Sequence, residues 1–168
     1  MKNVLVLIFS AIQFISCQTS QSTLSELIGK DYRDASKFRV LDNFKKNVES
    51  LVMDLSDTKY KVAQYQKYTS TIILLEKDEK NNDGKITCTI VDAIRFEGMD
   101  ENKQIVLLTC RLKGKHDPTL IAVCQQEKVE YEYFKNVVKA WKVDTLNGKI
   151  KEIDTKDLDC LNIGFGND

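Results

Sequence analysis

The chain is poor in several residues that specialised functions need. Its 168 residues include one His and one Pro, and 25 basic side chains are balanced by 25 acidic ones. A neutral chain lacks the basic footprint of a nucleic-acid-binding protein, so we expect no nucleic-acid partner. One His leaves little for acid–base catalysis, and no Cys-x-x-Cys pair offers zinc ligands. The sequence also has no glycine-rich phosphate loop and no pair of catalytic carboxylates, so we predict no catalytic residue, no metal and no cofactor.

The composition that is present fits one folded domain. Hydrophobic residues make up 42% of the chain and charged residues 30%, a balance that excludes wholesale disorder. The length suits a single domain of ordinary size.

The first seventeen residues have the pattern of an export signal. Lys2 gives a positive start, and residues 4–16 form an apolar run that is too short to span a membrane as a helix. The run ends in Phe14-Ile15-Ser16-Cys17, and polar residues follow it. This end resembles a bacterial lipobox, which implies a signal peptide over residues 1–16, cleavage before Cys17 and a lipid on Cys17. An ordinary signal peptidase that cuts nearby and releases a soluble secreted protein is the alternative.

The C-terminal end carries a second resemblance. Its residues Lys139-Ala140-Trp141-Lys142-Val143-Asp144, the Asn147-Gly148-Lys149 turn and Leu158-Asp159-Cys160 resemble the ends of small uncharacterised exported lipoproteins of the Bacteroidetes type. The resemblance implies a membrane partner, reached through the anchor on Cys17, and no particular activity. Surface-displayed members carry acidic residues after the lipid-bearing Cys, whereas Gln18-Thr19-Ser20 has none, which implies an outer-membrane anchor facing the periplasm.

The number of cysteines agrees with a lipid on Cys17. Four others remain, Cys88, Cys110, Cys124 and Cys160, and four can form two disulfides in an oxidising compartment. If residues 85–96 and 103–112 form a hairpin, Cys88 faces Cys110 at a separation that suits a bridge. By elimination Cys124 then pairs with Cys160. Buried free thiols are the alternative.

We predict an α+β fold in which one N-terminal amphipathic helix packs on an antiparallel sheet of about five to seven strands. Apolar residues recur at steps of three and four from Phe38 to Leu55, which predicts a helix over residues 35–55 with its stripe, including Leu51, facing the core. Residues 17–33 are expected to form a flexible tether, which leaves one domain over residues 34–168.

The rest of the chain has the shorter period of β-strands. Residues 71–77, 85–96 and 103–112 predict an antiparallel meander. Residues 137–144 and 149–153 predict a terminal hairpin closed by an Asn-Gly turn. Residues 119–124 fit either a strand or a helix start, and residues 125–136 stay unassigned.

Three side chains are candidates for binding a ligand: Asp92, Trp141 and Tyr133. Asp92 interrupts the apolar face between Ile90 and Ile94, where a carboxylate needs a partner or a cavity. Arg95 or Arg111 is a candidate partner for it, and a strand irregularity or a sheet edge is the alternative.

The two aromatic candidates have a similar pair of interpretations. Trp141 and Tyr133, with Tyr131 and Phe134 nearby, can line a binding groove or pack in the core.

Two weaker patterns are explained by turns. Residues 79–86 follow the start of a calcium loop, but Ile90 stands where a bidentate Glu is required. We therefore predict a hairpin turn at Asn81-Asn82-Asp83-Gly84, and a solvated turn at His116.

Three function classes follow. The leading one is a non-enzymatic envelope lipoprotein whose domain binds a protein or a small ligand, as an accessory or inhibitor module. The second is a secreted carrier of small ligands with a closed, lipocalin-like sheet. The third, an enzyme, would need Asp92, His116 or an unseen pair to converge in a cleft.

Overall fold

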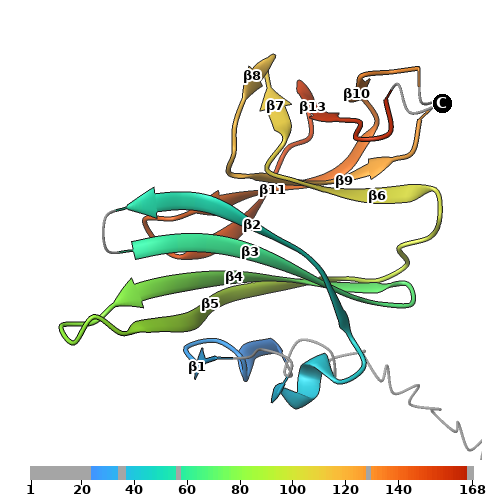
Figure 1. Cartoon of the computed structure of the whole chain (residues 1–168). Coiled ribbons are helices and arrows are strands. Elements are labelled where there is room, and N and C mark those ends of the chain that lie inside the picture. Colours follow the sequence, from blue (N-terminus) through green and yellow to red (C-terminus); the bar gives the residue numbers. More distant parts are fainter. Residues whose placement is uncertain (1–23, 34–36, 56–57, 128–129, 166–168) are drawn as a thin grey trace, which may run out of the picture.

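The computed structural model describes residues 24–33, 37–55, 58–127 and 130–165, which fold into three antiparallel β-sheets (Figure 1). Sheet A has the order β1-β5-β4-β3-β2, with β1 (Asp31–Tyr32), β2 (Lys45–Leu55), β3 (Thr58–Lys67), β4 (Ser70–Lys80) and β5 (Ile86–Phe96). Sheet B has the order β12-β11-β9-β6, with β6 (Lys103–Leu107), β9 (Leu120–Gln125), β11 (Val137–Asp144) and β12 (Lys149–Ile153). Sheet C has the order β10-β13-β7-β8, with β7 (Cys110–Leu112), β8 (Lys115–His116), β10 (Tyr133–Phe134) and β13 (Leu158–Leu161).

These sheets and an N-terminal segment, residues 24–33 and 37–44, stack as four layers. Sheet A packs on sheet B through a core that includes Ile73 and Ile121. The N-terminal segment covers the other face of sheet A, where Leu27 packs near Leu74. Sheet C covers the far face of sheet B, so sheet B lies between the other two sheets (Figure 1).

Strand β4 lies between two layers, which explains its unbroken apolar run. Ile73 and Leu75 belong to the core shared with sheet B, whereas Ile72 and Leu74 belong to the core under the N-terminal segment. All four side chains are fully buried. A strand that is covered on both faces needs apolar residues on both, so its sequence does not alternate.

The predicted N-terminal helix is wrong, and with it the α+β class. Residues 35–55 contain the short 3-10 helix η2 (Arg39–Leu41) and the eleven-residue strand β2. Within the described ranges, helical residues are confined to 24–25, 37 and η2, with a turn over residues 26–29. The described protein is therefore an all-β fold.

Two bulges interrupt the two-residue alternation of β2. The pairing of β2 with β3 shifts between Lys46 and Val48 and again between Leu51 and Met53. Each bulge adds one residue to β2 and shifts its alternation by one position, so the strand lacks a regular two-residue period. Val52 is buried, but Leu51, which was predicted to face the core, is 52% exposed.

Most strand predictions are confirmed, but the predicted pairing of residues 85–96 with residues 103–112 is wrong. β5 pairs with β4 and β1, whereas β6 pairs with β9. Residues 103–112 divide into β6 and β7, and Leu108 between them has a positive φ of 62°. Residues 119–124 fall in β9, so they form a strand.

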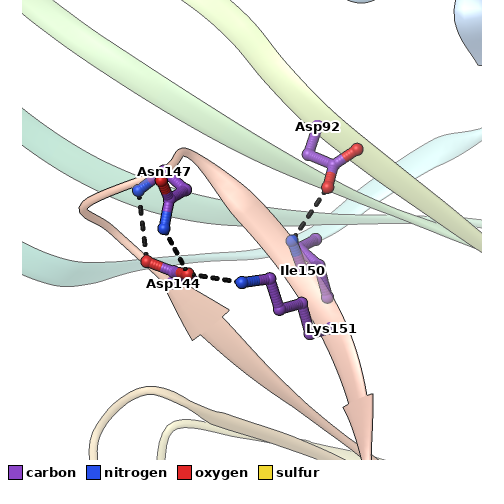
Figure 2. Close-up of polar contacts among 5 residues, drawn as sticks. All are labelled: Asp92, Asp144, Asn147, Ile150 and Lys151. Atoms are coloured by element: carbon purple, nitrogen blue, oxygen red, sulfur yellow. Dashed lines mark hydrogen bonds and ion pairs between the residues drawn. The ribbon is translucent and has the colours of Figure 1, made fainter.

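The terminal hairpin is confirmed as β11 and β12, with Asp144 opposite Lys149. Its turn is held by Asp144, which accepts hydrogen bonds from the backbone N–H and side-chain amide of Asn147 at 3.1 and 2.8 Å (Figure 2). Lys151 lies 2.7 Å from the same carboxylate. These three donors lower the pKa of Asp144, so the turn keeps its charge.

The disulfide connectivity also differs from the prediction. Cys110 is bonded to Cys160, its cross-strand neighbour in sheet C, and Cys88 and Cys124 are free thiols. The predicted Cys88–Cys110 and Cys124–Cys160 bridges depended on a hairpin of β5 with β6, which does not form.

The predicted signal peptide, residues 1–16, and the lipid site Cys17 lie outside the described residues. Part of the predicted tether, residues 17–33, is described, and there Leu24 and Leu27 are buried against sheet A. No helix in the described ranges is long and apolar enough to cross a membrane.

Candidate functional site

A cleft of about 590 Å³ lies beside β5 of sheet A, bounded by Leu24 of the N-terminal segment, the β5–β6 connection and strands β9, β11 and β12 of sheet B. We call it the interlayer cleft. Its apolar wall consists of Leu24, Ala93, Ile94, Phe96, Met99, Val123, Val138 and Trp141. Its volume falls in the range of pockets that bind small molecules.

Trp141 and Phe96 form the aromatic part of this wall. Their ring centroids are 4.7 Å apart and their planes meet at 64°, an edge-to-face pair that joins the two sheets. Trp141 is 6% exposed and belongs to the core between sheets A and B. Trp141 therefore packs in the core and also lines the interlayer cleft, so both interpretations from the sequence apply.

The rim of the interlayer cleft carries more positive than negative side chains. Arg95, Lys103 and Lys139 face Glu97 and Glu152 around it. Two of the cations have partners in the protein, since Arg95 pairs with Glu97, and Lys103 Nζ lies 3.0 Å from an oxygen of Asp100 outside the cleft.

Lys139 differs from these two cations. It is exposed, and no acidic partner for it occurs in the part of the chain that the structure describes. Its ammonium is therefore available to an anionic group at the mouth of the interlayer cleft.

Asp92, a predicted ligand residue, connects two sheets instead. Its Oδ2 accepts a hydrogen bond from the backbone N–H of Ile150 at 2.8 Å (Figure 2), and its Oδ1 accepts one from Ala93 N–H at 3.0 Å. Lys149 Nζ lies 3.8 Å from Oδ1. Asp92 adjoins the bulge of β5 against β4, so the strand irregularity considered from the sequence is present.

The two arginines proposed as partners of Asp92 pair elsewhere. Arg95 pairs with Glu97, and Arg111 pairs with Asp159.

Tyr133, the third candidate, lies in sheet C and does not line the interlayer cleft. The Arg111 guanidinium lies 3.3 Å from the centroid of its ring. Arg111 also forms two hydrogen bonds of 2.7 Å with the Asp159 carboxylate. Tyr133 therefore helps to orient an arginine that links β7 to β13, a stabilising contact of sheet C.

A buried polar cluster under the N-terminal segment was not predicted. Glu76 is 1% exposed, and its Oε1 has no hydrogen-bond partner among the described residues. Burial raises the pKa of Glu76, although a hydrogen bond with the Tyr32 hydroxyl opposes that shift. Burial also raises the pKa of the neighbouring Cys88 thiol to about 12. Only the position of Glu76 after an apolar run hinted at this cluster.

Two further sequence patterns are explained by the structure. Residues 81–84 lie in the turn between Lys80 and Ile86, which are paired across β4 and β5, as predicted. In that turn Asn81 Oδ1 accepts a hydrogen bond from Lys85 N–H at 2.8 Å. The turn predicted at His116 is wrong: His116 lies in the short strand β8, exposed, with Nε2 at 3.0 Å from the carbonyl oxygen of Leu108. No group of three or more His, Cys, Asp or Glu residues in the described ranges is arranged to hold a metal ion.

Comparison with known proteins gives no relative. No family model matches the chain, no curated protein is similar to it, and no solved structure matches its fold.

Proposed function

We propose that this chain is an exported, lipid-anchored binding protein that holds a small amphipathic anion in its interlayer cleft. The observation that carries the proposal is the Phe96–Trp141 pair in the wall of a cleft whose rim bears Arg95, Lys103 and Lys139. An apolar ligand body gains free energy by leaving water against this wall, at about 25 cal/mol per Å² of apolar surface. A carboxylate, sulfonate or phosphate of the ligand then meets Lys139 at the rim.

The membrane location in this proposal rests on the sequence Phe14-Ile15-Ser16-Cys17 and the polar residues after it. A lipid on Cys17 would hold the domain at the outer membrane, facing the periplasm. The intact mass of the natively expressed protein tests this part. Cleavage before Cys17 with added acyl chains supports it, whereas a mature chain without acyl chains indicates a soluble secreted protein.

The binding part can be tested with a probe of matching chemistry. Trp141 is the only tryptophan, so energy transfer from it reports an aromatic probe in the interlayer cleft. We use 1-anilinonaphthalene-8-sulfonate, which joins an apolar body to one negative charge. We expect saturable transfer from Trp141 to the probe in the folded mature protein.

Two variants distinguish the cleft from general surface binding. Lys139→Glu reverses a charge at the rim and should weaken probe binding about tenfold, which corresponds to about 1.4 kcal/mol. Lys156→Glu makes the same change at an exposed residue that does not line the cleft, and should leave binding unchanged. Equal affinity of the wild type and Lys139→Glu, or no saturable binding, contradicts the proposal.

A further inference from the structure

A second concave site lies where the turn before β2 meets the β3–β4 hairpin. It has a volume of about 630 Å³, and we call it the basic pocket. Its charged and aromatic lining residues are Arg39, Asp42, Phe44, Lys67, Tyr68 and Arg95. Only Arg95 is shared with the interlayer cleft.

Three cations from distant parts of the chain converge on the basic pocket. Arg39 comes from η2, Lys67 from the end of β3 and Arg95 from β5. Lys67 Nζ lies 5.9 Å, and the Arg95 guanidinium carbon 5.8 Å, from the centroid of the Phe44 ring. Two like charges beside one ring repel each other, and an anion between them would relieve that repulsion.

The protein neutralises these cations only in part. Asp42 is the one carboxylate that lines the pocket, and Lys67 Nζ donates to its backbone carbonyl oxygen at 3.4 Å. Arg95 is engaged through Nε by the Ser70 hydroxyl at 3.1 Å and by Glu97. Within the described ranges Arg39 is exposed and has no acidic partner, so the pocket keeps an excess of positive charge.

The backbone at the rim is held in an unfavourable conformation. Tyr68 has a φ of 52° and Asn43 a φ of 65°. Asn adopts this left-handed region readily, whereas a bulky residue such as Tyr rarely does. The Tyr68 side chain is nevertheless 88% exposed, so core packing does not explain it. The positive φ belongs to the two-residue β3–β4 hairpin loop, Tyr68-Thr69, which the Lys67–Ser70 pair closes. This turn places Lys67 and Tyr68 at the pocket.

We propose that the basic pocket binds a phosphate group, either as inorganic phosphate or as the phosphate monoester of a lipid head group. Guanidinium groups match pairs of phosphate oxygens, and an ammonium adds a point charge. Arg39 and Arg95 supply the guanidinium groups and Lys67 supplies the ammonium. Thr69 also lines the pocket. Asp42 lines the pocket and Glu97 pairs with Arg95, so three cations stand against two carboxylates and leave an excess of positive charge for the phosphate. This site goes beyond the proposed function, because its ligand does not enter the interlayer cleft.

Calorimetric titration of the mature protein at pH 7.5 and low salt tests the proposal with three probes. Inorganic phosphate and the water-soluble lipid dihexanoyl phosphatidic acid both carry the phosphate group without a counter-charge. Dihexanoyl phosphatidylcholine has the same chains with a neutral head group. We expect saturable binding of the first two and none of the third. Tenfold tighter binding of phosphatidic acid than of inorganic phosphate identifies a lipid head group as the source, and equal affinities identify free phosphate.

A double variant, Arg39→Gln with Lys67→Gln, should weaken phosphate binding at least tenfold. The matched control Lys156→Gln removes a cation outside the pocket and should bind as the wild type does. Thermal unfolding checks that the double variant is folded. If the double variant does not fold, the single variant Arg39→Gln, at an exposed position, is used for the same titration. No saturable binding of either anion, or equal affinity in the variant and the wild type, overturns the proposal. Since neither residue lines the interlayer cleft, binding of anilinonaphthalene sulfonate should persist in this variant.

Discussion

The Asp92 carboxylate and the Ile150 backbone N–H, 2.8 Å apart, form a hydrogen bond that ties sheet A to sheet B (Figure 2). Ile150 lies in β12, at an edge of sheet B. Its neighbour across the hairpin, Val143, donates its own N–H to Thr119 on the other side. Asp92 therefore supplies an acceptor to a strand edge that faces another layer, where water has limited access.

Removal of this acceptor should destabilise the fold. We expect Asp92→Ala to lower the free energy of unfolding by about 1 to 3 kcal/mol, because the buried Ile150 N–H loses its partner. Urea unfolding followed by Trp141 fluorescence measures this. Asp92→Asn keeps a carbonyl acceptor and should lose less. Lys149→Ala removes only a 3.8 Å ion pair at a half-exposed side chain and should change stability by less than about 1 kcal/mol. Equal stability of Asp92→Ala and the wild type would argue against the link.

Local patterns predicted the elements that depend on neighbours in sequence. The terminal hairpin follows from a turn and two alternating strands, and residues 71–77 follow from their apolar run. The helix predicted over residues 35–55 is wrong because β2 forms by pairing with β3 at the edge of sheet A, and the sequence of β2 alone does not show that partner.

Pairings between segments that are distant in the chain also could not be predicted from the sequence. The bridge of Cys110 to Cys160 spans 50 residues, and no local pattern places β7 beside β13. Of the three predicted ligand residues, Trp141 lines the interlayer cleft, whereas Asp92 and Tyr133 each bind a neighbouring part of the protein. The cations of the basic pocket lie on three separate elements, so their convergence could not be read from spacing.

Truncations in β2 and β4 should separate the helical prediction from the observed fold. Leu74 is fully buried, whereas Leu51 is 52% exposed. We expect Leu74→Ala to cost about 2 to 5 kcal/mol of unfolding free energy, as a cavity in a packed core does. Leu51→Ala should stay within about 0.5 kcal/mol of the wild type. Denaturant midpoints measure both, and a large loss in Leu51→Ala would instead place that side chain in the core.

The free thiols should be protected in the folded protein. Burial raises the pKa of both Cys88 and Cys124 to about 12, so few thiolates form at pH 8. We expect slow alkylation of the folded, unreduced protein and rapid alkylation of both residues in guanidinium, measured by mass spectrometry. Cys110 and Cys160 should react only after reduction. Labelling of Cys110 without reduction would contradict the observed bridge.

Removal of the Cys110–Cys160 disulfide should lower the free energy of unfolding and leave the free thiols of Cys88 and Cys124 unchanged. The double substitution Cys110→Ser with Cys160→Ser opens a loop with a sequence separation of 50 residues. In the loop-entropy estimate this costs about 4 kcal/mol. The matched control Cys88→Ser removes a thiol outside the bridge and should cost less. A double variant as stable as the wild type would show that the bridge adds nothing to the fold.

The buried Glu76 should make stability fall as pH rises. Burial raises its pKa in the folded protein above the ordinary value of 4.5, so the folded state binds this proton more tightly than the unfolded state does. The contribution of Glu76 to the free energy of unfolding is therefore fully present below pH 4.5. It is lost as the pH rises through the pKa that Glu76 has in the folded protein.

Glu76→Gln tests this effect because the amide stays neutral at every pH. We expect the variant and the wild type to have similar unfolding free energies near pH 4. By pH 8 the variant should be more stable by about 1 to 3 kcal/mol, because it buries no unpaired charged oxygen. Glu79→Gln, at an exposed residue of the same strand, is the matched control and should show no such pH-dependent gain. If Glu76→Gln is instead less stable than the wild type at pH 8, the expectation is contradicted. In that case Tyr32, Lys46 and Lys61 stabilise the ionised carboxylate by more than burial destabilises it.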